Sequence, residues 1–401
     1  MIFVFDTYGE NGYMPNLIHR TDIVPRSKEW WDLAITPPYS YEFRFLRYLF
    51  TEGIPYRIEL VSTMKQTGEK CVYPINLNYF DPSIDYLSLM SATALNMAKQ
   101  GQLTILFYYS EGDNVDWHIT AKLKEMCCKH EIQSKYVKFV IANKAAGKRF
   151  LFFPDDELYY RYLNKDSDYV KDINLDTRSK KFTCLNRIDK PFRRLFAATL
   201  VEKNLHSQAY FSYNDKKYSL EYPTSETEVD QWVTHWDQSV LKRFNPPYKC
   251  DMLLDYQHNM HQLIDKKFFN DAYWNVVVET HIGKNTVFLT EKTFKPILNL
   301  QPFLIIGAPG TIALLHELGY KTFGNWIDES YDTIHDSELR LWHCIKIVEY
   351  LATLSDQCHQ NLMAQMQSVL KHNQNHFLAS KKQKLLDLID YIELDNVTNL
   401  V

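Results

Sequence analysis

Short apolar runs alternate with segments of helical periodicity along most of the chain. The runs at 2–5, 56–61, 103–108 and 137–142 are rich in β-branched and aromatic residues, and each predicts a buried strand. Between the last two runs, residues 115–130 have the periodicity of an amphipathic helix. Strands that alternate with helices in this way indicate a parallel, doubly wound sheet.

A second pattern of the same kind follows residue 181. It consists of a strand at 182–185, a helix at 190–204, a strand at 209–213 and a helical region at 229–241. Residues 337–390 are helical in pattern nearly throughout, and the tail at 382–392 is amphipathic. The chain is therefore expected to contain two α/β halves that are closed by C-terminal helices.

The segment 165–181 is the best candidate for a linker, because it has few apolar residues and many charges. We therefore expect an N-terminal domain at 1–175, a C-terminal domain at 176–370, and a helix within 371–401 that packs back on the body. About 150 residues per domain is a usual size, so 401 residues fit two or three domains. One large sheet with an added embellishment is the alternative.

The segment 274–322 carries the strongest functional pattern. An apolar run ends at the acid Glu279, and a helix then opens on Thr290, Glu291 and Lys292. The next apolar run, at 303–306, breaks at a Gly-Ala-Pro-Gly loop before another helix. Polar residues thus gather where strands end and helices begin. Open α/β sheets bind ligands at that edge, and helix N-termini favour anions.

A basic segment at 178–194 precedes this region by about one domain length. It holds seven basic residues and one acid, a local charge of +6 in a chain that totals −4. Asp189 is expected to cap the following helix, and Pro191 suits its first turn. A phosphate bound there would meet Arg187, Lys190 and the helix N-terminus. The plain alternative is a solvated basic helix face.

The Thr290-Glu291-Lys292 helix start has two interpretations. In the structural one, Thr290 is an N-cap, and Glu291 forms an i, i+4 pair with Lys295. In the functional one, Glu291 binds ribose hydroxyls and Lys292 binds a diphosphate. A lysine in the first turn is unfavourable beside the positive end of the helix dipole, and a nearby anion would offset this repulsion. At Gly307 the chain could pass close to a ligand, although a plain turn explains this glycine equally well.

In the N-terminal half, the candidates for acid or base chemistry are Glu111 and Asp113. They follow the strand at 103–108, where an open-sheet enzyme places such groups. A loop whose Asp113 caps the next helix is an equal alternative. The loop after the first strand, which begins at Asp6, could line the same cleft.

Composition narrows the class of protein. The net charge of −4 gives no global basic field for nucleic acid. Seven scattered cysteines without a C-x-x-C pair are typical of a reduced, cytoplasmic protein without structural zinc. The apolar start at 1–5 predicts a buried strand rather than a signal peptide. No apolar stretch approaches the roughly 20 residues of a membrane span. The histidines show no metal-ligand spacing, so no metal site is expected.

Two groups of residues resemble the donor half of GT-B glycosyltransferases, and most of all the fucosyltransferase-like group. They are Leu185, Asn186, Arg187, Pro191 and Arg193, and then Thr290, Glu291, Lys292, Phe294 and Pro296. The segment 301–323 is also similar to a group of uncharacterised, often phage-encoded, glycosyltransferase-like proteins. The resemblance covers the C-terminal half and reaches the N-terminal half mainly at 109–114.

The resemblance implies an α/β, GT-B-like fold with two Rossmann-like domains facing a cleft and a helical C-terminal tail. A nucleotide sugar would bind the C-terminal domain, with Arg187 and Lys292 on its diphosphate and Glu291 on its ribose. Such enzymes usually invert the anomeric carbon and need no cofactor or catalytic metal. Glu111 and Asp113 are the candidates for the base. The acceptor could be a glycan, a lipid-linked sugar, a protein or a hydroxymethylated DNA base in phage DNA modification.

Two other functions fit the same residues. One is a non-catalytic protein that binds nucleic acid or a nucleotide through the basic segment, with strong salt dependence. The other is a degenerate glycosyltransferase fold that serves as a scaffold. The sequence gives no prediction of the sugar, the nucleotide or the oligomeric state.

Overall fold

The chain forms two compact units in the computed structural model, which describes residues 1–6, 17–18, 44–64, 67–77, 80–110, 117–186, 189–213, 238–249, 265–283 and 285–393. Unit 1 comprises Met1–Tyr162 and Ser380–Val401, and unit 2 comprises Leu163–Ala379. The expected boundaries lay at 175/176 and 370/371. The chain passes into unit 2 after Tyr162 and returns to unit 1 at Ser380.

The sheet of unit 1 is parallel in every strand pair of its described part. Its order is β3-β1-β4-β5-β6-β7, and β2 pairs with β4 beside this path. Its strands are β1 (Ile2–Phe5), β2 (Leu17–Ile18), β3 (Arg57–Leu60), β4 (Cys71–Leu77), β5 (Leu103–Tyr109), β6 (Val137–Ile141) and β7 (Leu151–Phe152). The four strands expected in this half are confirmed. The sequence interpretation missed β4, which is buried along its whole length despite Pro74 in its middle.

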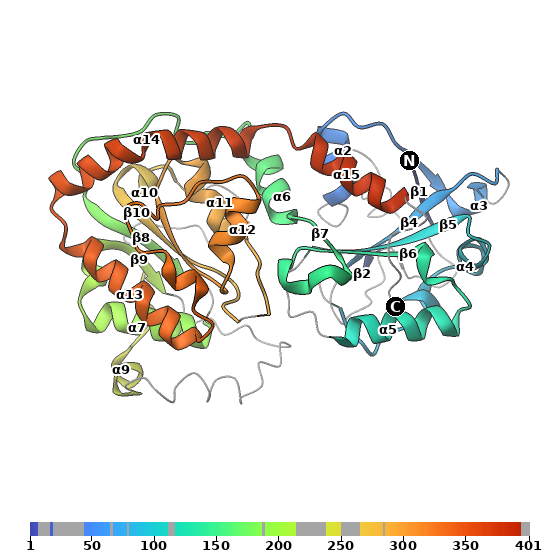
Figure 1. The fold of residues 1–401 in the computed structure, drawn as a ribbon, viewed down its shortest axis with the longest axis horizontal. Coiled ribbons are helices and arrows are strands. Elements are labelled where there is room, and N and C mark those ends of the chain that lie inside the picture. Colours follow the sequence, from blue (N-terminus) through green and yellow to red (C-terminus); the bar gives the residue numbers. More distant parts are fainter. Residues whose placement is uncertain are drawn as a thin grey trace. The chain divides into compact units, whose positions relative to one another are not determined.

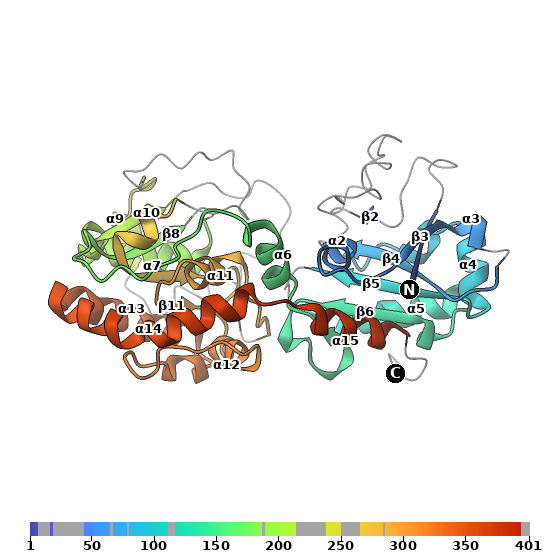
Figure 2. The same cartoon turned by 90° about the horizontal axis from the view of Figure 1, so that it is seen from above.

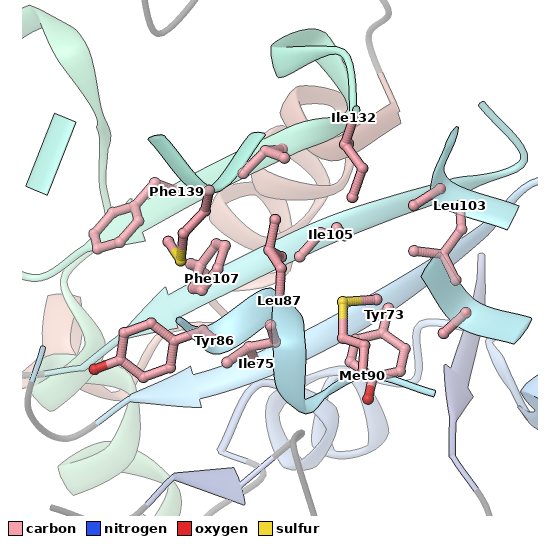
Figure 3. Packing of buried hydrophobic residues seen from close by; sticks show 14 of the residues in the cluster. Tyr73, Ile75, Tyr86, Leu87, Met90, Leu103, Ile105, Phe107, Ile132 and Phe139 are labelled. Atoms are coloured by element: carbon pink, nitrogen blue, oxygen red, sulfur yellow. The ribbon is translucent and has the colours of Figure 1, made fainter. Parts of the chain in front are cut away.

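The core of unit 1 lies between this sheet and the helices that follow its strands. Figure 3 shows Tyr86, Leu87 and Met90 packed against side chains of β4, β5 and β6. Phe107 stacks on Phe139, with 5.9 Å between ring centroids. The helical elements of unit 1 are α2 (Arg44–Thr51), α3 (Val61–Met64), η2 (Tyr86–Leu89), α4 (Ala92–Lys99), α5 (Trp117–Lys129), η3 (Ser134–Tyr136), η4 (Lys144–Arg149), α6 (Asp155–Asn164) and α15 (Lys382–Glu393).

The sheet of unit 2 is also parallel, with the order β11-β10-β8-β9. Its strands are β8 (Lys180–Asn186), β9 (Ala209–Tyr213), β10 (Ala272–Val278) and β11 (Phe303–Ile306). The chain moves outward from β8 to β9 and then continues on the other side of β8 with β10. The strand order therefore reverses between β8 and β10, and such a switch point opens a crevice at the carboxyl ends of the strands.

Helices lie on both sides of this second sheet. In Figure 1, α14 lies above the strands, and α7 and α13 lie below them; Figure 2 gives the view at right angles. The helical elements of unit 2 are α7 (Pro191–Glu202), η5 (Leu205–Gln208), α9 (Gln238–Arg243), α10 (Lys267–Asn270), α11 (Glu291–Leu298), α12 (Thr311–Glu317), η6 (Ser330–Thr333), α13 (Ser337–Thr353) and α14 (Asp356–Leu378).

The polar segment 165–181, expected to be a linker, belongs to unit 2 and packs against the rest of it. The backbone N–H of Val170 donates to Asn299 Oδ1 at 3.1 Å, and Gln374 Nε2 donates to the Val170 carbonyl at 2.7 Å. Arg178 is buried, and its guanidinium donates to the carbonyls of Phe269 and Ala272. The segment has the charge count that is typical of a linker. Its backbone and Arg178 nevertheless form hydrogen bonds to the rest of unit 2.

The α/β class, the two parallel sheets and the helical C-terminal part, from α13 to α15, are confirmed. Because the described strands form two separate sheets, the alternative of one large sheet is wrong. The cleft between two domains stays a prediction. None of the described helices is long and apolar enough to cross a membrane.

Candidate anion-binding site at the carboxyl edge of the unit 2 sheet

Two helices begin beside the switch point between β8 and β10. Helix α7 has Lys190 as its N-cap residue, and α11 has Thr290. The Thr290 hydroxyl accepts a hydrogen bond from the Lys292 backbone N–H, as the sequence predicts. Both N-termini therefore contribute partial positive charge to the same edge of the sheet, where each also carries a lysine.

Glu279 is the first residue after β10, and its side chain is fully buried. Oε1 accepts from the Thr290 backbone N–H at 3.1 Å and from Thr293 Oγ1 at 2.6 Å. Oε2 accepts from the Thr280 backbone N–H at 3.2 Å and from Thr290 Oγ1 at 2.6 Å. A buried carboxylate is costly unless it is hydrogen-bonded, and two donors on each oxygen meet that requirement.

Lys292 lies in the first turn of α11. Its side chain is 27% exposed, which leaves it accessible to a ligand. Nζ lies 3.0 Å from Thr290 Oγ1, 3.2 Å from Thr280 Oγ1 and 3.3 Å from Glu291 Oε1. An ammonium group has three N–H donors, so each can be directed at one of these oxygens. The ion pair of Glu291 with Lys292 was not foreseen, since Lys295 was the expected partner.

Lys190 reaches the same place from the other helix. Its Nζ donates to the Thr280 carbonyl at 2.8 Å, while Lys292 contacts the Thr280 hydroxyl. The ammonium groups of Lys190, at the start of α7, and Lys292, in α11, therefore both bond to Thr280, the first to its carbonyl and the second to its hydroxyl. Such a pair of cations beside two helix N-termini is an arrangement that favours a bound phosphate.

Arg193, in the first turn of α7, is 3% exposed. Its NH2 group donates to the Glu279 carbonyl at 2.9 Å and to the Val278 carbonyl at 3.3 Å. Burial lowers the pKa of Arg193, and the nearby carboxylates of Glu279 and Glu291 act against that shift. These hydrogen bonds connect Arg193 to the end of β10. The positive charge of Arg193 adds to the electrostatic field of the site.

The local charge is positive. The three cations Lys190, Arg193 and Lys292 face the two carboxylates of Glu279 and Glu291, and three minus two leaves +1. The two helix N-termini add to this balance. An anion is therefore favoured over a cation at this edge.

The expected cap of α7 is wrong. Lys190, not Asp189, is the N-cap residue, and it makes no side-chain cap hydrogen bond. The Asp189 carboxylate accepts from Arg194 through both oxygens and from Tyr213 Oη at 2.5 Å. Asp189 therefore ties the β8–α7 connection to the end of β9, and Pro191 stands in the first turn as expected.

The Gly307 loop leads into α12. The N-terminus of α12 differs from that of α11, because a carboxylate of the protein itself already occupies it. The Asp332 carboxylate accepts from the backbone N–H groups of Ile312 at 2.9 Å and Ala313 at 3.2 Å. The Gly307 carbonyl accepts from Arg340 Nε, and Gly310 has a left-handed φ of 88°. Burial raises the pKa of Asp332, and the helix N–H groups act against this. The loop is a tight turn held from within the protein.

Three predicted site residues, Arg187, Glu111 and Asp113, lie outside the described residues. Lys295 lies half-buried in α11, where its carbonyl accepts from Asn299 Nδ2. Thr290, Glu291, Lys292, Lys190 and Arg193 are brought together, as described above. Among the described residues, no group of three or more His, Cys, Asp or Glu side chains is arranged to hold a metal ion.

The sequence interpretation missed Thr280 as the meeting point of the two lysines and did not count Glu279 as part of the site. An acid that directly follows a buried β-branched run was the available signal for Glu279. Its three threonine partners come from both ends of the β10–α11 connection and from α11, so no local spacing reveals them.

Comparisons with protein-family models and with curated protein sequences gave no match. Among solved structures, the chain is similar to one titled "Crystal Structure of alpha1,3-Fucosyltransferase". The identity is 11% and the TM-score 0.40, and the alignment covers 99% of this chain and 90% of that chain. At this identity and TM-score, neither the fold nor the function of this chain is inferred from the likeness.

Proposed function

We propose that this protein is a glycosyltransferase that holds the diphosphate of a nucleotide sugar at the carboxyl edge of the unit 2 sheet. The observation that carries the proposal is the convergence of Lys190 and Lys292 on Thr280 at the β8/β10 switch point. Anionic ligands of open α/β sheets bind at such points. The resemblance of the Thr290-Glu291-Lys292 motif to donor-binding domains agrees with this placement.

In the proposed complex, a phosphate oxygen takes the place of Glu291 on Lys292. That contact, at 3.3 Å, is the longest of the three around Nζ. The released Glu291 carboxylate then accepts from a ribose hydroxyl. Lys190 contributes from the other helix, and Arg187 from the β8–α7 connection. The same cations stabilise the negative charge that grows on the diphosphate as it leaves the sugar.

The proposed reaction is a direct displacement with inversion and without a metal ion. The bond between the anomeric carbon and the phosphate oxygen breaks, and a bond from the acceptor hydroxyl oxygen to that carbon forms. A carboxylate takes the hydroxyl proton, for which Glu111 and Asp113 are the candidates. The acceptor is a hydroxyl of a glycan or of a hydroxymethylated DNA base, and the leaving group is a nucleoside diphosphate.

A thermal-shift panel of nucleotide sugars and nucleoside diphosphates tests the proposal. A ligand at a hundred times its dissociation constant stabilises the folded state by about 2.7 kcal/mol, which is readily measured. We expect one nucleotide, with or without its sugar, to raise Tm well above the rest. Incubation with that nucleotide sugar and an acceptor panel should then release the nucleoside diphosphate.

Failure of every nucleotide to shift Tm would contradict the proposal. If duplex or single-stranded DNA then bound with a steep dependence on salt, the non-catalytic nucleic-acid-binding function would replace it. Binding of a nucleotide without turnover of any nucleotide sugar would instead support the scaffold alternative.

A further inference from the structure

We infer that Glu279 is a positioning residue that orients the Lys292 ammonium group through the hydroxyl of Thr290. The contacts form a continuous chain: Glu279 Oε2 to Thr290 Oγ1 at 2.6 Å, and Thr290 Oγ1 to Lys292 Nζ at 3.0 Å. Glu279 is fully buried, whereas Lys292 is partly exposed. For its ligand, this inference rests on the proposed function.

The direction of these hydrogen bonds is fixed by the carboxylate. An ionised carboxylate only accepts, so the single hydrogen of the Thr290 hydroxyl must point at Glu279. The lone pairs of Oγ1 then face the Lys292 backbone N–H and Nζ, both of which only donate. Glu279 thereby sets the polarity of the Thr290 hydroxyl, and that polarity makes it an acceptor for the ammonium group.

A glutamine at position 279 would break this pattern in either orientation of its amide. Each oxygen of Glu279 receives one backbone N–H, from Thr280 on Oε2 and from Thr290 on Oε1. The amide NH₂ of glutamine would therefore face a backbone donor at either position. In one orientation it would also donate to Thr290 Oγ1 and turn the hydroxyl hydrogen away from Glu279.

Thr293 provides a matched control for Thr290. Both hydroxyls lie 2.6 Å from a Glu279 oxygen, and both side chains are buried. Only the Thr290 hydroxyl also contacts Lys292. Valine has the shape of threonine without its hydroxyl, so the pair Thr290→Val and Thr293→Val separates an effect on Lys292 from the loss of a bond to Glu279.

The first test needs no ligand. The rate of acylation of Lys292 by acetic anhydride is measured by peptide mass spectrometry in the full chain, with exposed Lys371 as the internal reference. We expect the relative rate to rise several-fold in Glu279→Gln and Thr290→Val, and to stay within about twofold in Thr293→Val and Thr290→Ser. Equal rates in all variants would overturn the inference even if nucleotides bind.

The second test measures affinity by calorimetry for pyrophosphate and for UDP, GDP, ADP, CDP and dTDP. Thr290→Val removes the hydrogen bond that orients the Lys292 ammonium group, so binding of the tightest of these ligands should weaken by about tenfold or more. Thr290→Ser and Thr293→Val should bind like the wild type. In a Lys292→Met background, Glu279→Gln and Thr290→Val should have no further effect on affinity.

The outcomes separate the two ideas. If the wild type binds none of these ligands, the proposed function fails, while the acylation rates still decide whether Glu279 orients Lys292. If ligands bind and the losses in Glu279→Gln and Lys292→Met simply add, Glu279 stabilises the fold without acting through Lys292. If Glu279→Gln does not fold, the two valine variants decide the question by themselves.

Discussion

Two fully buried glutamates, Glu279 in unit 2 and Glu157 in unit 1, receive their hydrogen bonds from different kinds of donor. Glu279 accepts from backbone N–H groups and threonine hydroxyls, one of which leads to a partly exposed lysine. Glu157 is bonded directly by two lysines, Lys381 Nζ at 2.7 Å and Lys384 Nζ at 2.9 Å. The first network ends at a lysine whose side chain is 27% exposed. In the second network, both lysines pair with the carboxylate, and these contacts tie α6 to the start of α15.

The ion cluster around Glu157 has a structural purpose. Burial alone would raise the pKa of Glu157, but the Lys384 and Lys381 ammonium groups outweigh it and lower the pKa to about 2. Close by, Arg161 pairs with Glu52 at 2.6 Å. The two lysine contacts join α6, the last helix before the chain leaves unit 1, to the segment with which it returns, and the Arg161–Glu52 pair ties α6 to the residue after α2. The buried charges around Glu157 therefore stabilise the place where the chain leaves and re-enters unit 1.

The largest predicted effect is therefore at Glu157. Glu157→Leu removes the carboxylate that pairs with Lys381, whose side chain is 4% exposed, and this should cost about 3–5 kcal/mol in the free energy of unfolding. Urea unfolding measures the loss. Glu349 is the matched control, because it also pairs with two lysines, Lys203 and Lys346, but lies nearer the surface. Glu349→Leu should cost under about 1 kcal/mol, and equal costs would contradict the comparison.

Acid should destabilise the protein through the same group. The pKa of Glu157 is lowered in the folded state, to about 2, so its contribution is fully present above the unfolded pKa of about 4.3. That contribution is lost as pH falls from there toward 2. Between about pH 5 and pH 2.5 the wild type should lose more stability than Glu157→Gln, by a few kcal/mol. Parallel curves for the two proteins would show that Glu157 is not ionised and paired as described.

The smallest predicted effect concerns Asp332, a third buried carboxylate. It fills the N-terminus of α12 by accepting from Ile312 and Ala313, as a bound anion would. Asp332→Ala should cost about 1 kcal/mol of stability, as the loss of a helix cap does, and should leave nucleotide affinity unchanged. Urea unfolding and calorimetry measure the two quantities. A loss of nucleotide affinity in Asp332→Ala would instead show that the Gly307 loop belongs to the binding site.

Much of the fold followed from local patterns. The run at 303–306 and the run at 209–213 have the bounds of β11 and β9, because continuous apolar segments of that length suit parallel strands with both faces covered. The sequence interpretation missed β4, and Pro74 in its middle is unusual for a central strand. In the structure, β4 nevertheless pairs with β5 along its whole length.

The candidate site was predictable only in part. The N-cap Thr290 and the first-turn lysine are local features, and they were found. The position of Asp189 beside Arg194 and Tyr213 depends on the end of another strand, so its predicted role as a cap was wrong. The burial of Arg178 and Arg193 depends on carbonyl groups about 90 residues away in the chain. Charge counts along a segment do not reveal which charges the fold encloses.

The central claim is that Lys292 binds a diphosphate, and calorimetry with the nucleoside diphosphate that binds tightest tests it most directly. Lys292→Met removes the charge and keeps the length of the side chain, and Lys371→Met does the same on an exposed face of α14. We predict that Lys292→Met weakens binding at least about tenfold, as expected for a lost charge-assisted bond, while Lys371→Met binds like the wild type. Wild-type affinity in a folded Lys292→Met protein would contradict the account.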